Sequence, residues 1–215
     1  MTNNNQNAAN GPKQAKPNRV AVTVPARLHF GFLDLHGGLG RRFGSFGMAL
    51  EGLCTRLHAV LADDLRVDGT DQTSSATERA MDFARILNDR LGLKGGTTFT
   101  LEEIVPDHAG LGSGTQLGLA VGMALTKLHG LNMSAGELAR LLGRGARSGI
   151  GIGVFERGGV ILDGGVAMEG DDNSLGHSED GPPPPAISRL AFPNEWRVML
   201  ILEARSKGLH GGKES

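Results

Sequence analysis

Residues 106–116 read PDHAGLGSGTQ, with glycine at positions 110, 112 and 114 and hydroxyl side chains at positions 113 and 115. The segment follows an alternating, strand-like run at 97–102 and precedes a run rich in Leu, Ala and Met at 113–128 that is typical of a helix. Closely spaced glycines allow a sharp turn whose N–H groups converge, and the positive end of the helix dipole points to the same place. This order of elements predicts a phosphate site built from Gly110, Leu111, Gly112, Ser113, Gly114 and Thr115.

The alternative for this segment is an ordinary glycine-rich turn that only opens a helix. The flanking proline, the leucine between the glycines and the long helix of small residues favour phosphate binding. The segment is not a Walker A loop, because no lysine follows the glycines, and its glycine spacing differs from that of a dinucleotide fingerprint.

The rest of the chain interleaves strand and helix patterns. Strands are expected at 19–24, where Pro25 would end the run, and at 56–61, 97–102, 159–163 and 197–203. Helices are expected at 77–91, at 113–128 and from a capping box at 134–137. Interleaving of this kind predicts an α/β or α+β sheet covered by helices.

Composition excludes several classes of protein. The 215 residues carry a formal net charge of −1, so nothing in the charge balance indicates binding to nucleic acid or to an anionic membrane. No apolar run is long enough to span a bilayer, and the polar N-terminus lacks a signal core, so we expect a cytoplasmic enzyme. The 34 glycines cluster in a few segments, which indicates loops that turn tightly or approach a ligand closely.

A second segment, residues 25–35 (PARLHFGFLDL), places Arg27, His29 and Asp34 within eight residues beside further glycines. We interpret these three as candidate functional side chains. The alternative is a strand whose polar residues face solvent, with Asp34 capping a turn.

A third segment, residues 143–159 (GRGARSGIGIGVFERGG), follows the third predicted helix. It reads as a loop too rich in glycine to pack by itself. Arg144 and Arg147 carry guanidinium groups suited to phosphate or carboxylate, and the alternative is a mobile linker with solvated arginines.

Two polar stretches suggest the domain limits. Residues 1–18 read as a disordered tail, and residues 170–186 as an exposed acidic and proline-rich loop. The expected organisation is therefore a domain at 19–169 and the start of a second domain at 187–215.

Pro106, Gly110, Leu111 and Ser113 match the P-x-x-x-G-L-x-S-S motif of the GHMP kinase superfamily, which the segment resembles, although Gly114 replaces the second serine. The resemblance implies an α+β fold with an N-terminal domain like the second domain of ribosomal protein S5. It also implies a ferredoxin-like C-terminal domain, which would be largely missing from a truncated chain of this length.

The three segments together are similar to those of the β-ribofuranosylaminobenzene 5′-phosphate synthase family, which belongs to that superfamily without being a kinase. The resemblance implies condensation of 4-aminobenzoate with phosphoribosyl pyrophosphate, with loss of carbon dioxide and pyrophosphate. It places this pentosyltransferase reaction in tetrahydromethanopterin biosynthesis and one-carbon metabolism, with Mg²⁺ required. Superfamily enzymes of this type are often dimers, so a homodimer is possible.

One position separates the synthase from the kinases. When the S-G-x-D-x-A…G-G segment of homoserine and mevalonate kinases is laid on residues 148–159, its catalytic aspartate falls on Gly151, which cannot act as a base. A small-molecule kinase with another carboxylate, such as Asp163, remains the alternative, and an inactive fragment is a third reading.

The synthase reading assigns roles by residue type. The glycine segment would receive the pyrophosphate, and Asp34 would bind Mg²⁺. Arg27, Arg144 or Arg147 would hold the ribose 5-phosphate or the aromatic carboxylate, and His29 would move a proton.

Overall fold

The computed structural model describes residues 16–38, 40–69, 74–168 and 181–202. Its strands are β1 (Arg19–Asp34), β2 (Arg41–Ala62), β3 (Arg66–Asp68), β4 (Gly96–Glu103), β5 (Val160–Asp163), β6 (Val166–Ala167) and β7 (Ala186–Leu190). Its helices are α1 (Ser74–Leu91), α2 (Ser113–Leu128), α3 (Ala135–Leu141) and α4 (Ile150–Arg157). The expected α+β class is confirmed.

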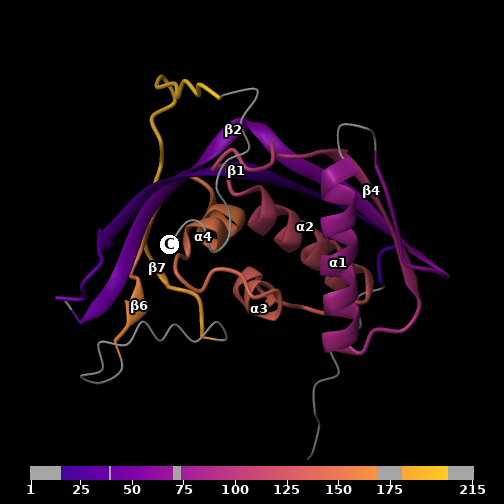
Figure 1. Cartoon of the computed structure of the whole chain (residues 1–215). Coiled ribbons are helices and arrows are strands. Elements are labelled where there is room, and N and C mark those ends of the chain that lie inside the picture. Colours follow the sequence, from indigo (N-terminus) through magenta and orange to yellow (C-terminus); the bar gives the residue numbers. More distant parts are fainter. Residues whose placement is uncertain (1–15, 39, 70–73, 169–180, 203–215) are drawn as a thin grey trace, which may run out of the picture.

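The long strand β2 organises the sheet. Its order is β3-β4-β2-β5-β7, and β1 and β6 also pair with β2. All pairings of β2 are antiparallel, whereas β3 and β4 run parallel. The four helices lie together on one side of β1, β2 and β4 (Figure 1).

The core forms between this sheet and helix α2. Eleven of the sixteen residues of α2 are buried, as expected for a helix that is apolar nearly all round. Small residues let neighbours approach closely: a Cβ atom built on Gly118 would lie 3.1 Å from a Leu142 side-chain carbon, and one on Gly122 would lie 3.1 Å from Leu138. Helix α2 is therefore held firmly, and its N-terminus is fixed against β1.

Strand β1 does not end at Pro25, as the sequence analysis predicted. The pairing register with β2 shifts between Pro25 and Ala26, where residues 51–53 of β2 have no partner on β1, and the strand continues to Asp34. Val24, before the shift, belongs to the core under α2, and Arg27, after it, lies against the loop that leads into α2. Pairing with β2 on both sides of the shift therefore carries β1 past Pro25 and places Arg27 at the glycine loop.

The expectation of a loop over residues 143–159 is also wrong in part, because residues Ile150–Arg157 form helix α4. Its glycines are packing positions: a Cβ atom on Gly153 would lie 2.8 Å from a methyl carbon of Ile161, and one on Gly151 would lie 3.1 Å from a methyl carbon of Thr115. Glycine lowers helix propensity, but here it permits close contact with β5 and α2.

The remaining predictions are confirmed in part. Helices α1, α2 and α3 and strands β4 and β5 lie where they were expected, while the strand expected at 56–61 is part of the much longer β2. The strand expected at 197–203 is wrong, because residues 197–202 have no regular structure, and residue 203 lies outside the described residues. Most of the expected tail at 1–18 and loop at 170–186 also lies outside them.

Candidate active site

The N-terminus of α2 has no cap of its own. Gly112 is the N-cap residue, adopts a left-handed conformation with φ 77°, and provides no side-chain cap. The first intrahelical bond runs from the Gln116 N–H to the Gly112 carbonyl, at 3.0 Å. The N–H groups of the first turn therefore point out of the helix without a carbonyl partner inside it.

Two hydrogen bonds fix the glycine loop on β1. The Arg27 N–H donates to the Leu111 carbonyl at 3.0 Å, and Arg27 Nη1 donates to the Gly110 carbonyl at 3.2 Å. The Arg27 side chain also fills the space beside Gly112, since a Cβ atom there would lie 2.7 Å from Arg27 Cγ. The loop and the arginine thus form one unit.

At the N-termini of α3 and α4, backbone N–H groups donate to side chains of the protein itself. Ser134 and Glu137 form a capping box at the start of α3. At the start of α4, the Gly149 N–H donates to Asp163 Oδ2 at 2.8 Å, and the Ile150 N–H donates to Ser148 Oγ at 3.2 Å. Neither α2 nor α4 has a side-chain cap on its N-cap residue, but the first N–H of α4 bonds to Ser148.

Two more arginines flank this uncapped turn. A Cβ atom on Gly114 would lie 3.8 Å from Arg79 Nη1 and 3.9 Å from Arg144 Nη1. The Arg144 guanidinium lies 5.4 Å from the centre of the Phe83 ring. Arg144 as a whole is exposed, yet partial burial of this guanidinium and then the charge of Arg79 lower its pKa. Two cations converge here on the positive end of a helix, which is an arrangement for binding an anion.

Asp107 holds Arg79 in this arrangement. Its carboxylate pairs with Arg79 and accepts a hydrogen bond from the Ser75 hydroxyl at 2.6 Å. Burial alone raises the pKa of Asp107, but Ser75, Arg79 and the Ser113 hydroxyl together lower it below the ordinary value. Ser113 opens α2, so Asp107 links helix α1 to the glycine loop.

A second polar cluster lies where β1, β2, β5 and the start of α4 meet. His29 Nε2 is 3.2 Å from Ser148 Oγ, which is 2.6 Å from Ser45 Oγ. Ser45 Oγ donates to Asp163 Oδ2 at 2.5 Å. His29 stands two residues after Arg27 on β1, and burial followed by the charge of Arg27 lowers its pKa, against an opposing effect of Asp163.

Asp163 is 1% exposed and its oxygens are saturated. They accept three backbone N–H bonds, from Ser45, Gly149 and Gly165, at 2.8–3.0 Å, besides the hydroxyls of Ser45 and Ser148. A carboxylate bonded in this way is not available to a substrate hydroxyl, so it is poorly suited to replace a kinase base. Gly151 is buried against the start of α2, where a Cβ atom would lie 3.1 Å from a methyl carbon of Thr115 and 3.9 Å from Gln116 Nε2.

The structure brings together most of the residues that the sequence singled out. Gly110 to Thr115, Arg27 and Arg144 lie around the start of α2, with His29 adjoining. Asp34 lies at the far end of the β1–β2 hairpin, about 20 Å of extended strand beyond Arg27, where it accepts N–H bonds from His36 and Gly37 and pairs with His36. Arg147 is exposed and makes no hydrogen bond or ion pair with any described residue.

Sequence reasoning gave no role to Arg79, Asp107, Ser45 or Ser148. Asp107 lies inside the glycine segment and Ser148 inside the third segment, so their position was a usable signal. Arg79 lies on α1, 28 residues before Asp107, and nothing local distinguishes it from a solvated surface arginine.

No group of three His, Cys, Asp or Glu side chains gathers in the described part of the chain to hold a metal. Near the start of α2, the described carboxylate is Asp107. Magnesium usually keeps one or two protein carboxylates and takes its other ligands from phosphate and water. The residues fit a magnesium ion that arrives with a phosphate ligand, but not a cage made by protein alone.

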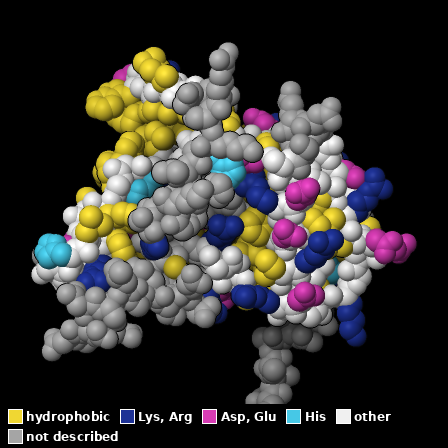
Figure 2. All heavy atoms as spheres, viewed as in Figure 1, with side chains coloured by type: hydrophobic (Ala, Val, Ile, Leu, Met, Phe, Trp, Pro, Cys, Tyr) yellow, Lys and Arg dark blue, Asp and Glu magenta, His cyan; other side chains and the backbone are white. Residues whose placement is uncertain are grey.

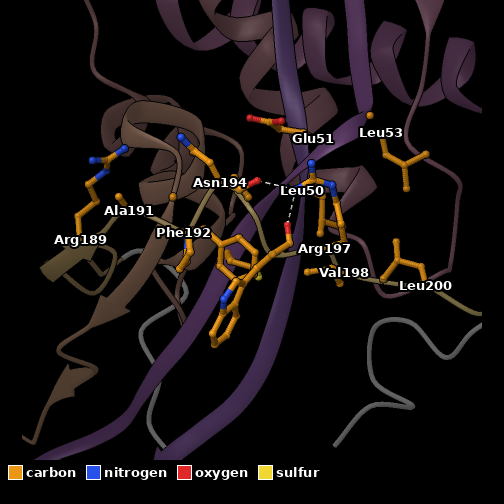
Figure 3. Close-up of a pocket in the computed structure, with 16 residues that line it drawn as sticks. Leu50, Glu51, Leu53, Arg189, Ala191, Phe192, Asn194, Arg197, Val198 and Leu200 are labelled. Atoms are coloured by element: carbon orange, nitrogen blue, oxygen red, sulfur yellow. Dashed lines mark hydrogen bonds between the residues drawn. The ribbon is translucent and has the colours of Figure 1, made fainter.

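A separate pocket of about 850 Å³ lies between β2 and the segment 189–200, and it shares no residue with the anion site. Trp196, Phe192 and Leu50 line it, and both described bonds of Arg197 go to the backbone carbonyls of Asn194 and Trp196 (Figure 3). Hydrophobic side chains gather on the surface at this end of the molecule (Figure 2), where Met199 and Ile201 are more than four-fifths exposed.

None of the described helices has the length and apolar character needed to cross a membrane.

Comparison with known proteins identifies the domain. The GHMP kinases N terminal domain family matches residues 78–159, which include α2 and the glycine loop. Two solved structures share the fold: an L. major mevalonate kinase bound to R-mevalonate (TM-score 0.54, 17% identity, 70% of this chain and 52% of that one) and a Streptococcus pneumoniae phosphomevalonate kinase (TM-score 0.53, 14% identity, 68% and 48%).

Closer relatives are three archaeal proteins named beta-ribofuranosylphenol 5′-phosphate synthase. They come from Methanothermobacter thermautotrophicus (34% identity), Methanocaldococcus jannaschii (35%) and Archaeoglobus fulgidus (37%). Each match covers 91% of this chain, which spans 60–62% of the length of these relatives. The chain belongs to the GHMP superfamily through its N-terminal domain, and within that superfamily it is a relative of the beta-ribofuranosylphenol 5′-phosphate synthases.

Proposed function

We propose that the protein serves the transfer of a 5-phosphoribosyl group from phosphoribosyl pyrophosphate to the ring of a benzoate, with release of carbon dioxide and pyrophosphate. The observation that best supports this proposal is the uncapped first turn of α2 between Arg79 and Arg144, with Arg27 behind it. Charge accumulates on the pyrophosphate as the bond to C1 of the ribose breaks, and fixed N–H dipoles and guanidinium groups stabilise that charge.

The benzoate is proposed from chemistry. Its ring carbon that bears the carboxylate attacks C1 of the ribose, and loss of carbon dioxide restores the aromatic ring. A 4-amino substituent would give an aminobenzene product, and a 4-hydroxy substituent would give a phenol. The relatives are named for a phenol product, which favours 4-hydroxybenzoate over the 4-aminobenzoate expected from the sequence.

An aromatic surface adjoins His29 on β1. Phe32 lies edge-on to His29, with ring centroids 5.1 Å apart, and it is 40% exposed. Its second neighbour is Phe43, at 5.0 Å. A benzoate ring placed against Phe32 would lie beside His29, which stands two residues after Arg27 on the same strand. The aromatic contact supports a ring-bearing substrate in addition to the phosphate donor.

A GHMP-type kinase is the second candidate, because the shared fold is that of kinases. Two observations count against it: Gly151 stands where the kinase segment has its aspartate, and Asp163 is buried and saturated with hydrogen bonds.

Magnesium, when bound, would neutralise the pyrophosphate and polarise the bond to its leaving oxygen. Asp107 is the described carboxylate placed to support it.

The test is a paired assay on the purified chain. Phosphoribosyl pyrophosphate is supplied with carboxyl-labelled 4-hydroxybenzoate or 4-aminobenzoate and Mg²⁺, and labelled carbon dioxide and pyrophosphate are measured. Equimolar release supports the proposal, and the better acceptor names the substrate. Transfer of the ATP γ-phosphate without pyrophosphate release would support the kinase. Tight binding of pyrophosphate without turnover would indicate a binding fragment, or a site completed by a second copy of the chain.

A further inference from the structure

The hydrogen-bond directions around His29 can be assigned from its fixed donors. The Gly31 N–H donates to His29 Nδ1 at 3.1 Å, and a backbone N–H can only donate. Nδ1 is therefore the unprotonated nitrogen, and the neutral ring carries its proton on Nε2. That proton is donated to Ser148 Oγ, 3.2 Å away.

The donor and acceptor roles of Ser148 follow from the His29 tautomer. Its oxygen accepts from His29 Nε2 and from the Ile150 N–H, at 3.2 Å each, so its single proton is left to donate. Two acceptors lie within reach of that proton, Ser45 Oγ at 2.6 Å and Asp163 Oδ2 at 3.2 Å, and the Ser45 proton goes to Asp163 Oδ2 at 2.5 Å. The hydrogen bonds therefore run from His29 through Ser148, directly or by way of Ser45, to a buried carboxylate.

Asp163, the last acceptor in this series of hydrogen bonds, fixes their direction. Asp163 is buried and makes no ion pair with any described Lys or Arg, so its charge is balanced by five donors alone. Reversal of the series would remove the Ser45 proton from the carboxylate and leave it underbonded in a site closed to water. Partly satisfied networks of this kind are costly, so one direction is strongly preferred.

We propose that the Gly31 N–H, Ser148, Ser45 and Asp163 together lock His29 as the neutral imidazole protonated on Nε2, which makes His29 a positioning residue that anchors β1 beside Arg27. Both ring nitrogens are engaged by protein groups, so neither is open to a substrate proton. This replaces the proton-transfer role that the sequence suggested. The inference deepens the proposed function. The tautomer of His29 is independent of that function, and only the expected effects on turnover rest on it.

The charged groups around the ring agree with this assignment. Arg27 on the same strand and the partial burial of the ring both oppose an imidazolium, and Asp163 on β5 is the group that favours one. An imidazolium would also set an Nδ1–H against the Gly31 N–H. The pKa of His29 is therefore lower than that of an ordinary histidine, and its neutral form persists to a lower pH.

The direct test is ¹⁵N NMR of the histidine side chains of the whole 215-residue chain, with the His29 signals assigned from their loss in His29→Gln. We expect a pyridine-like Nδ1 and a pyrrole-like Nε2 at neutral pH, and in Ser148→Ala the same tautomer, kept by the Gly31 N–H, with an Nε2 signal shifted by the loss of its acceptor. An Nδ1-protonated ring, an imidazolium at pH 7, or an Nε2 signal that does not change in Ser148→Ala would overturn the proposal. Ser148→Thr keeps the hydroxyl and serves as the control if the alanine variant does not fold.

Two substitutions of His29 distinguish a positioning role from a proton-transfer role. In His29→Gln the carboxamide nitrogen takes the place of Nε2 and donates to Ser148, whereas His29→Asn is too short to reach it. We expect pyrophosphate affinity within about threefold of wild type for Gln and a loss of about tenfold or more for Asn, the size of one unsatisfied buried partner. Loss of turnover in His29→Gln with intact pyrophosphate binding would overturn the positioning role. The expected tautomer in a protein without synthase turnover would instead refute the proposed function alone.

Discussion

The side chain of Arg27 occupies the space that any side chain on Gly112 would need, since a Cβ atom there would lie 2.7 Å from Arg27 Cγ and 2.9 Å from Arg27 Nε. This contact joins strand β1 to the first turn of α2. It also makes the anion site sensitive to a single methyl group.

Gly112→Ala is therefore expected to weaken pyrophosphate binding at least tenfold, because the arginine and the loop must separate. The left-handed backbone adds a stability loss of about 1–2 kcal/mol. Gly92→Ala is the matched control, since Gly92 also has a positive φ but nothing within 4 Å of its Cβ position. Calorimetric titration and urea unfolding measure both effects. Equal affinity in the two variants would show that the loop does not hold the anion.

Arg144→Gln is expected to lower pyrophosphate affinity by about tenfold or more, the usual weight of a charge-assisted hydrogen bond. Arg147→Gln, three residues later in the same loop, should leave the affinity within twofold, because Arg147 makes no bond to any described residue. The two variants have the same net charge, so a general electrostatic effect would lower both equally. A larger loss in Arg147→Gln would reverse the assignment.

Gly151→Asp is expected to weaken pyrophosphate binding more than Gly151→Asn does, by about tenfold. The two side chains are equal in size and both crowd Thr115, 3.1 Å from the Cβ position. Because Gly151 is buried, the added charge also lowers stability, so urea unfolding must first show that both variants are folded before their affinities are compared. Identical affinities would place the phosphates away from the start of α2.

The interactions of Asp107 predict a dependence of stability on pH. Its pKa is below the ordinary value of 3.8, so the folded state favours the ionised form. The stabilisation is complete well above pH 3.8 and is lost as the pH falls through the lower, folded-state pKa. The free energy of unfolding of wild type should exceed that of Asp107→Asn most at neutral pH, and the gap should narrow below about pH 4. A gap that is constant from pH 7 to pH 3 would contradict the prediction.

Asp163→Asn is expected to cost about 2–4 kcal/mol of unfolding free energy, because an amide group would set its own N–H bonds against buried donors. Asp68→Asn is the surface control: Asp68 pairs with Arg66 in the open, and such pairs contribute about 0–1 kcal/mol. Urea denaturation at pH 7 compares them. Similar losses in the two variants would mean that Asp163 is not the buried anchor of this corner of the fold.

The sequence by itself determined the glycine-rich loop before α2, helices α1 to α3 and the class of fold. Local signals suffice for these, because glycine spacing, apolar periodicity and capping residues act within a few positions of one another. The same local reading failed at Pro25 and at residues 150–157. There the competing terms are non-local: pairing with β2 carries the strand through a register shift, and packing against Ile161 and Thr115 makes glycine acceptable in a helix.

Tertiary structure decided which polar residues share a site. Asp34 stands seven positions after Arg27, yet the extended hairpin carries it away from the loop and gives it a turn to cap. Arg79 and Asp163 come to the two clusters from distant parts of the chain, through the packing of α1 beside α2 and the pairing of β5 with β2. Residue types and spacings record chemistry along the chain, but only long-range packing sets which charges are close enough to act on one ligand.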